Sequence, residues 1–165
     1  MNNPLFAPLA LALLTVALPG GSSRANPHHQ ESRMPAHATA TGPFDVKMTP
    51  QSAPDAAVGR FALAKQYHGE LEATAVGEML TAMTAVQGSA GYVAIEKVTG
   101  RLAGRAGSFH LQHRGVMDRG QPALSITVVP DSGTGALAGL NGTMTIEVAP
   151  DGTHAYAFEY SLPKN

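Results

Sequence analysis

The chain of 165 residues contains no cysteine. Disulfide bonds, thiolate catalysis, cysteine-ligated zinc and a lipid anchor on an N-terminal cysteine are therefore excluded. Without covalent staples the fold must be stabilised by its core alone, which favours a closed sheet over a small disulfide-bonded scaffold.

Charged residues are scarce as well, at 14% of the chain, and the formal net charge is −1. Lys and Arg form no basic stripe, so nucleic acid is not an expected partner. The sequence has no phosphate-binding loop, dinucleotide fingerprint, serine-hydrolase elbow or HExxH motif. His28, His29 and His37 lack the spacing and the acidic partners of a closed metal site. We therefore expect no cofactor and no metal.

Residues 1–25 have the pattern of a secretory signal peptide. Leu5–Leu18 is an apolar run, shorter than the roughly 20 residues of a membrane-spanning helix. A Pro-Gly-Gly break follows, and the small residues Ser23 and Ala25 precede a cleavage site before Asn26. The first residues carry no Lys or Arg, and the alternatives are an uncleaved anchor or a wrongly assigned start codon. We expect export to the periplasm or the medium, with no membrane contact after cleavage.

Residues 26–40 show no apolar period and are interpreted as a flexible, disordered linker. Residues 41–163 then form a single domain. Its sequence consists of short β-type runs separated by turn residues. The runs are 44–48, 60–67, 71–82, 90–98, 108–114, 123–129, 143–148 and 155–162. Residues 71–84 are the closest to a helix, but Gly77 in their middle weakens that alternative.

The regular spacing of these runs predicts an all-β fold. About eight strands with one apolar face each and short links indicate an up-and-down antiparallel sheet, and closure into a barrel removes its exposed edges. A barrel of about this size has an interior that side chains fill or that holds one small ligand.

A glycine-rich pattern occurs twice, in Thr99–Phe109 and Thr134–Met144. Both copies read T-G-x-L-A-G-x-x-G-[ST]-apolar, and glycine at these places suits turns and barrel corners. A phosphate cradle is excluded because neither copy is followed by a helix start or a Lys-Ser/Thr pair. We predict two equivalent strand-turn-strand corners.

Val128–Met144, which includes the second copy, resembles the glycine-rich hairpin of allene oxide cyclases and plant dirigent proteins. More closely, four stretches resemble the bacterial DUF3224 family of unknown function: Gly69–Glu72, Gly88–Glu96, Gly107–His113 and His154–Leu162. The resemblance covers essentially residues 41–162. It implies an allene-oxide-cyclase-like barrel. The similarity to dirigent proteins also makes a homo-oligomer one of the assemblies to be expected. It leaves activity open, because a fold alone does not supply a function.

Two residues are candidates for acid–base chemistry. His113 shares a strand face with Phe109 and Leu111, which are expected to point inward. Glu96 shares a face of the preceding strand with Tyr92. The opposite face of that strand is more apolar, so the sequence does not decide which of the two faces points inward. If Glu96 faces the lumen, it can meet His113 there, either as an acid–base pair or as a structural hydrogen bond.

Lys65 lies on the same face as Leu63 and can also point inward. A buried lysine needs a carboxylate, which Glu96 or Glu78 could supply. The alternative is a position at the rim, with the ammonium group in water. A bulge at Gly77 would change the face of Glu78, so that face is not assigned.

We predict that the barrel binds a small apolar molecule in its lumen. The expected lining is Phe61, Leu63, Lys65, Tyr92, Phe109, Leu111, Tyr156, Phe158 and Tyr160. One alternative is an isomerase or cyclase resembling allene oxide cyclases, with Glu96 and His113 as its catalytic polar groups. Another is a structural or interaction protein with a filled core. The sequence leaves open whether the protein is an enzyme.

Overall fold

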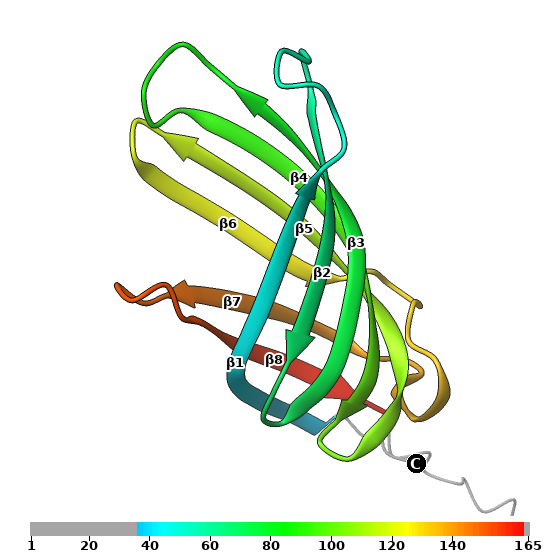
Figure 1. The fold of residues 1–165 in the computed structure, drawn as a ribbon. Coiled ribbons are helices and arrows are strands. Elements are labelled where there is room, and N and C mark those ends of the chain that lie inside the picture. The colour runs from blue at the N-terminus through cyan, green and yellow to red at the C-terminus, as the bar shows by residue number, and fades with distance from the viewer. Residues whose placement is uncertain (1–35, 164–165) are drawn as a thin grey trace, which may run out of the picture. The chain divides into compact units, whose positions relative to one another are not determined.

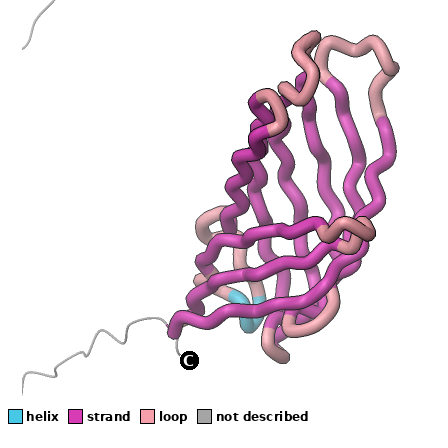
Figure 2. Tube along the Cα trace, turned by 90° about the vertical axis from the view of Figure 1, so that its left-hand side faces the viewer, coloured by secondary structure: helices cyan, strands magenta, loops and turns pink. Residues whose placement is uncertain are grey.

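The computed structural model describes residues 36–163, which form a barrel of strands (Figures 1 and 2). Residues 1–25, the expected signal peptide, and residues 26–35 of the expected linker lie outside this part of the chain. The strands are β1 (Ala36–Pro50), β2 (Gly59–Tyr67), β3 (Leu71–Met83), β4 (Ala90–Leu102), β5 (Arg105–Asp118), β6 (Gln121–Val128), β7 (Asn141–Val148) and β8 (His154–Leu162). A short 3₁₀ helix, η1 (Gly135–Leu137), precedes β7.

The predicted antiparallel barrel is confirmed. Each strand pairs with the next, and β1 also pairs with β8, so that eight strands close on themselves. β3 runs without interruption through Gly77, which rules out the helical alternative for this segment. Within residues 36–163 no helix is long and apolar enough to cross a membrane.

The linker interpretation is wrong for residues 36–40. These residues are the first part of β1 and pair with β8, from Ala36 opposite Leu162 to Ala40 opposite Phe158. Ala40 is buried in the core. Small and polar side chains hide the strand pattern here, and the pairing with β8 supplies the order that the local sequence does not indicate.

The two ends of the barrel differ. We call the end at which β1, β3, β5 and β7 finish the open end, and the other the closed end. β6 and β7 pair only at Ile126–Met144 and Thr127–Thr143, and Figure 1 shows the two strands diverging beyond these pairs. β1 pairs with β8 from Ala36 to Phe44 and with β2 from Phe44 to Pro50. The wall of the barrel is therefore continuous at the closed end and splayed at the open end.

Large side chains fill the closed end. Phe109 and Phe158 stack with ring centroids 5.7 Å apart, and both are almost fully buried. Leu137 of η1 and the following Leu140 are buried against this core. Because the closed end is packed in this way, any space inside the barrel must lie toward the open end.

The two glycine-rich copies are not equivalent corners. In the first, Ala103 and Gly104 form a two-residue turn between β4 and β5, with φ angles of 47° and 78°. In the second, the chain folds through η1 and returns against β5, where Ser108 accepts a hydrogen bond from the backbone N–H of Thr134. A shared sequence pattern thus gives a tight hairpin turn in one place and a longer connection that contains η1 in the other.

Candidate functional site

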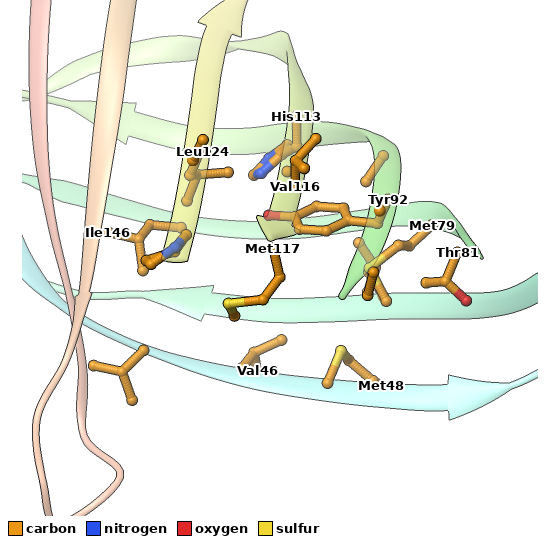
Figure 3. A pocket seen from close by; sticks show the side chains of 18 of the residues that line it. Val46, Met48, Met79, Thr81, Tyr92, His113, Val116, Met117, Leu124 and Ile146 are labelled. Atoms are coloured by element: carbon orange, nitrogen blue, oxygen red, sulfur yellow. The ribbon is translucent and has the colours of Figure 1, made fainter. Parts of the chain in front are cut away.

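The open end contains a cavity of about 490 Å³ (Figure 3). All eight strands contribute to its wall because the alternate residues of each strand point inward. Most of the lining is apolar and comes from the strand ends. These apolar residues include Phe44, Val46, Met48, Leu63, Met79, Met83, Met117, Leu124, Ile146 and Val148.

A few polar side chains interrupt this lining, namely Lys65, Thr81, Tyr92, His113 and His154. Lys65 and His113 are only 8% and 3% exposed, which places them at the floor of the cavity, next to the packed core. Tyr92 is half-buried, and its ring projects from β4 into the cavity (Figure 3).

A buried carboxylate joins the groups at the floor. Glu96 is 1% exposed and does not line the cavity itself. Its Oε1 atom lies 3.0 Å from Nζ of Lys65, 2.9 Å from the hydroxyl of Tyr67 and 2.9 Å from Nε2 of His113. Lys65 also donates a hydrogen bond to the Tyr67 hydroxyl at 3.3 Å. We call these residues, Lys65, Tyr67, Glu96 and His113, the floor cluster.

The backbone of β3 approaches β4 closely beside this carboxylate. Gly77 pairs with Glu96, and a β-carbon added to Gly77 would overlap the carbonyl oxygen of Ile95 and the Cα and Cβ atoms of Glu96. The strand has no bulge at this point, so Glu78 faces outward and pairs with Arg60 at 2.7 Å on the surface. Glu96, not Glu78, is therefore the partner of Lys65.

The surroundings keep Glu96 ionised. Burial raises the pKa of its carboxyl group, and Oε2 has no hydrogen-bond partner among the described residues. The hydrogen bond from His113 and the charge of Lys65 together outweigh this effect, so the pKa lies below its ordinary value. Burial, and then the nearby Glu96, raise the pKa of Tyr67, which remains a protonated donor. The Lys65 ammonium also lies 5.3 Å from the centre of the Phe44 ring, a cation–π distance.

The family model described as "protein of unknown function (DUF3224)" matches residues 40–160, which include the strands of the floor cluster. The chain belongs to the DUF3224 family. A search among proteins with curated descriptions found no match.

A crystal structure of another family member supports the same fold. It is a protein of unknown function from the DUF3224 family of Shewanella oneidensis MR-1, determined at 1.84 Å resolution. This chain is 52% identical to it, and the alignment covers 79% of this chain and all of the other, with a TM-score of 0.73.

The residues predicted for the site of this DUF3224 barrel separate into two groups. Leu63, Lys65, Tyr92 and His113 line the cavity, with Glu96 directly behind them. The other predicted lining residues do not reach it. Phe109, Leu111, Tyr156 and Phe158 belong to the packed core, Tyr160 packs against that core, and Phe61 is half-buried outside the cavity.

Two features of the site were not predicted from the sequence. Tyr67, two residues after Lys65 on the same strand face, was not among the predicted site residues, although its hydroxyl contacts both Lys65 and Glu96. The methionines at the strand ends were also missed. Met48 and Met79 continue the inward faces of β1 and β3, and extending those alternations would have found them.

Among the described residues, the imidazoles outside the floor cluster form no metal-binding group. His68 pairs with Asp45 at 3.1 Å on the surface. Within the part of the chain that the structure covers, no three His, Asp or Glu side chains lie close enough to hold a metal ion.

Proposed function

We propose that this DUF3224 protein binds a small apolar molecule in the open end of its barrel. The observation that carries the proposal is a cavity of about 490 Å³ with an apolar wall and polar groups gathered at its floor. Ligand pockets typically enclose about 300–1,000 Å³ and combine an apolar lining with a few placed polar groups. Burial of the ligand's apolar surface supplies the affinity, and the floor orients its polar end.

The division of the barrel supports this proposal over a purely structural role. The closed end contains the stacked pair Phe109–Phe158 and the buried Leu137 of η1, which belong to the packed core. A protein selected only for its core would gain stability by filling the remaining space. An apolar cavity that side chains do not fill, next to a polar cluster, is instead typical of a binding site.

A fluorescence titration tests the proposal with N-phenyl-1-naphthylamine, an uncharged apolar probe. Ala94→Leu adds a side chain to the cavity wall, whereas Val93→Leu changes the outer face of the same strand, where Val93 is 51% exposed. We expect the wild type and Val93→Leu to enhance the probe's fluorescence equally and Ala94→Leu to bind it more weakly. Equal enhancement by all three proteins would place the probe on the surface and contradict the proposal.

A second candidate function is an isomerase or cyclase resembling allene oxide cyclases. The contact of 2.9 Å between His113 and Glu96, at the floor of an apolar cavity, favours it. A carboxylate that orients an imidazole makes a general base, which typically contributes about 10²–10⁴-fold to a rate.

Hydrogen–deuterium exchange at the α-carbon of 2-tetralone, followed by NMR in D₂O, tests this second function. We expect Glu96→Gln and His113→Ala each to slow the exchange by about 10²-fold or more. If both variants exchange the ketone as fast as the wild type does, the enzyme hypothesis loses its named residues.

Export through residues 1–25 is a further part of the proposal. It rests on the apolar Leu5–Leu18 run and the small residues before Asn26. The intact mass of the protein from the culture medium and the periplasm tests it. A chain that begins at Asn26 is expected, and a full-length chain in the cell pellet alone would contradict export.

A further inference from the structure

The floor cluster fixes which nitrogen of His113 carries a proton. An ionised carboxylate can only accept hydrogen bonds, so Nε2 of His113 must donate to Oε1 of Glu96 over their 2.9 Å contact. In a neutral imidazole the other nitrogen, Nδ1, then bears a lone pair. No residue between 36 and 163 occupies Nδ1 with a hydrogen bond in the structure.

His113 also lies on the cavity side of Glu96. His113 lines the cavity and Glu96 does not, so the imidazole stands between the carboxylate and the ligand space. Lys65 lines the same floor, and its ammonium group uses two hydrogen bonds, to Glu96 and Tyr67, out of the three that it can donate. The floor therefore offers a lone pair on His113 next to a cationic donor on Lys65.

We propose that this floor selects apolar ligands that carry a weakly acidic hydroxyl group, of the phenol or enol class, and takes the proton of that group. This inference rests on the proposed function and names its ligand class. In the proton transfer the ligand O–H bond breaks and an N–H bond forms on Nδ1 of His113. The electron pair of the broken bond stays on the ligand oxygen, which becomes an anion beside Lys65.

The charges of the floor cluster favour this transfer. With a neutral imidazole at position 113, the buried cluster holds one cation, Lys65, and one anion, Glu96, at 3.0 Å before the transfer. After it, the new imidazolium lies against Glu96 and the new oxyanion lies beside Lys65, so each new charge meets an existing opposite one. The net charge of the buried site does not change, which avoids the cost of an unpaired charge in a low dielectric.

Other ligand classes fit this arrangement less well. An amine would place a second cation beside Lys65. A carboxylic acid already ionised in water would add an anion to the site without bringing the proton that His113 can accept. A ligand with a hydroxyl of intermediate acidity enters the open end in its neutral form, passes the apolar lining without a charge and ionises only at the floor.

The groups that face His113 are few. Glu96 on β4 contacts it directly, and Lys65 and Tyr67 on β2 share the same carboxylate oxygen. Tyr92 on β4 and His154 on β8 line the same cavity. From β6, the residue paired with His113 is Ile126, which carries no charge.

The experiment compares 2-naphthol with 2-methylnaphthalene, which has the same rings and no hydroxyl. Ultraviolet absorption distinguishes naphthol from naphtholate in the ground state, and equilibrium dialysis gives both affinities. We expect the wild type to bind 2-naphthol at least about tenfold more tightly than 2-methylnaphthalene. We also expect the naphtholate band to appear with protein at a pH where free 2-naphthol is neutral.

His113→Gln tests the basic lone pair separately from the hydrogen bond to Glu96, because glutamine keeps an N–H donor for Glu96 and has no basic lone pair. It should still bind 2-methylnaphthalene but lose the naphtholate band, and Lys65→Met should lose the preference for 2-naphthol. Val46→Ala, a change in the apolar wall, should weaken both probes by the same factor and keep the band.

The outcomes separate the two proposals. If both probes bind the wild type equally and no naphtholate forms, the inference about the floor is overturned while the binding function stands. If the naphtholate band persists in His113→Gln, the base is another group and the inference is overturned as well. If neither probe binds, and N-phenyl-1-naphthylamine does not bind either, the proposed function fails and the inference fails with it.

Discussion

The ring of Tyr92 on β4 occupies the space into which a side chain at Gly115, its paired neighbour on β5, would project. A β-carbon on Gly115 would overlap atoms of this ring. Both residues line the cavity, so the missing side chain at position 115 sets the place of the Tyr92 phenol. Glycine in the middle of a strand is otherwise unfavourable, and here the aromatic neighbour covers it.

Gly115→Ala should therefore displace the Tyr92 ring into the cavity. We expect weaker binding of N-phenyl-1-naphthylamine and a loss of roughly 1–3 kcal/mol in the free energy of unfolding, the usual range for overpacking. Gly91→Ala is the matched control, because a β-carbon there meets only the Gly115 carbonyl oxygen at 3.9 Å. Urea unfolding and probe titration measure both effects, and equal behaviour of the two variants would contradict the role of Gly115.

Glu96→Gln should destabilise the protein strongly, because it leaves the buried Lys65 ammonium without its anion. Breaking one partner of a buried ion pair typically costs about 3–5 kcal/mol. The double variant Lys65→Met/Glu96→Gln removes both charges, so we expect it to be more stable than the sum of the single changes predicts. Urea unfolding of the four proteins measures this coupling energy.

The surface pair Arg60–Glu78 provides the control for this cycle. It joins the neighbouring strands β2 and β3 at 2.7 Å, but both side chains are more than half exposed. Water and salt screen such pairs, so their coupling should be much smaller than that of Lys65 and Glu96. A surface coupling as large as the buried one would show that the floor cluster contributes no special electrostatic energy.

How much of this architecture the sequence could predict depends on the strand. In β8 only one face is apolar, and the predicted inward residues Tyr156 and Phe158 are indeed buried. In β4 both faces could have pointed inward, and the structure exposes about half of Val93 and Ile95 while it buries Glu96. The partners that make Glu96 acceptable in the interior come from β2 and β5, so the local pattern could not identify its face.

The position of a residue along the barrel axis was harder to predict than its face. Phe109 and His113 point inward from the same strand, yet one belongs to the packed core and the other lines the cavity. Their height depends on the pairing register and on the place where β6 and β7 separate, which periodicity does not contain. Periodicity therefore predicted that Phe109, Tyr156 and Phe158 line a cavity, whereas these side chains belong to the packed core.

The first residues of β1 should be needed for the closure of the barrel. A chain that begins at Thr41 lacks the pairs from Ala36–Leu162 to Ala40–Phe158 and leaves that edge of β8 open. Compared with a chain that begins at Ala36, we expect a melting temperature lower by at least about 5 °C and a tendency to associate. Differential scanning calorimetry and size-exclusion chromatography test this, and identical behaviour of the two chains would restore the linker interpretation.

Acid should weaken the fold through Glu96. Its pKa in the folded protein lies below the ordinary value, so between the two values the unfolded chain binds more protons and stability increases with pH. The contribution is complete above about pH 4.5, near the ordinary pKa of a glutamate, and is lost as the pH falls through the lowered value. Glu96→Gln removes this titration, and its free energy of unfolding should fall less steeply below that pH.

Urea unfolding at a series of pH values between about 3 and 7 measures both slopes. The exposed carboxylates of Glu78 and Asp151 also have lowered pKa values, but both proteins contain them, so they cancel in the comparison. Glu78→Gln should change the acid slope less than Glu96→Gln does, because solvent screens its pair with Arg60. Parallel slopes for the wild type and Glu96→Gln would mean that Glu96 is not held ionised by Lys65 and His113, and the proton-accepting role of the floor would lose its electrostatic basis.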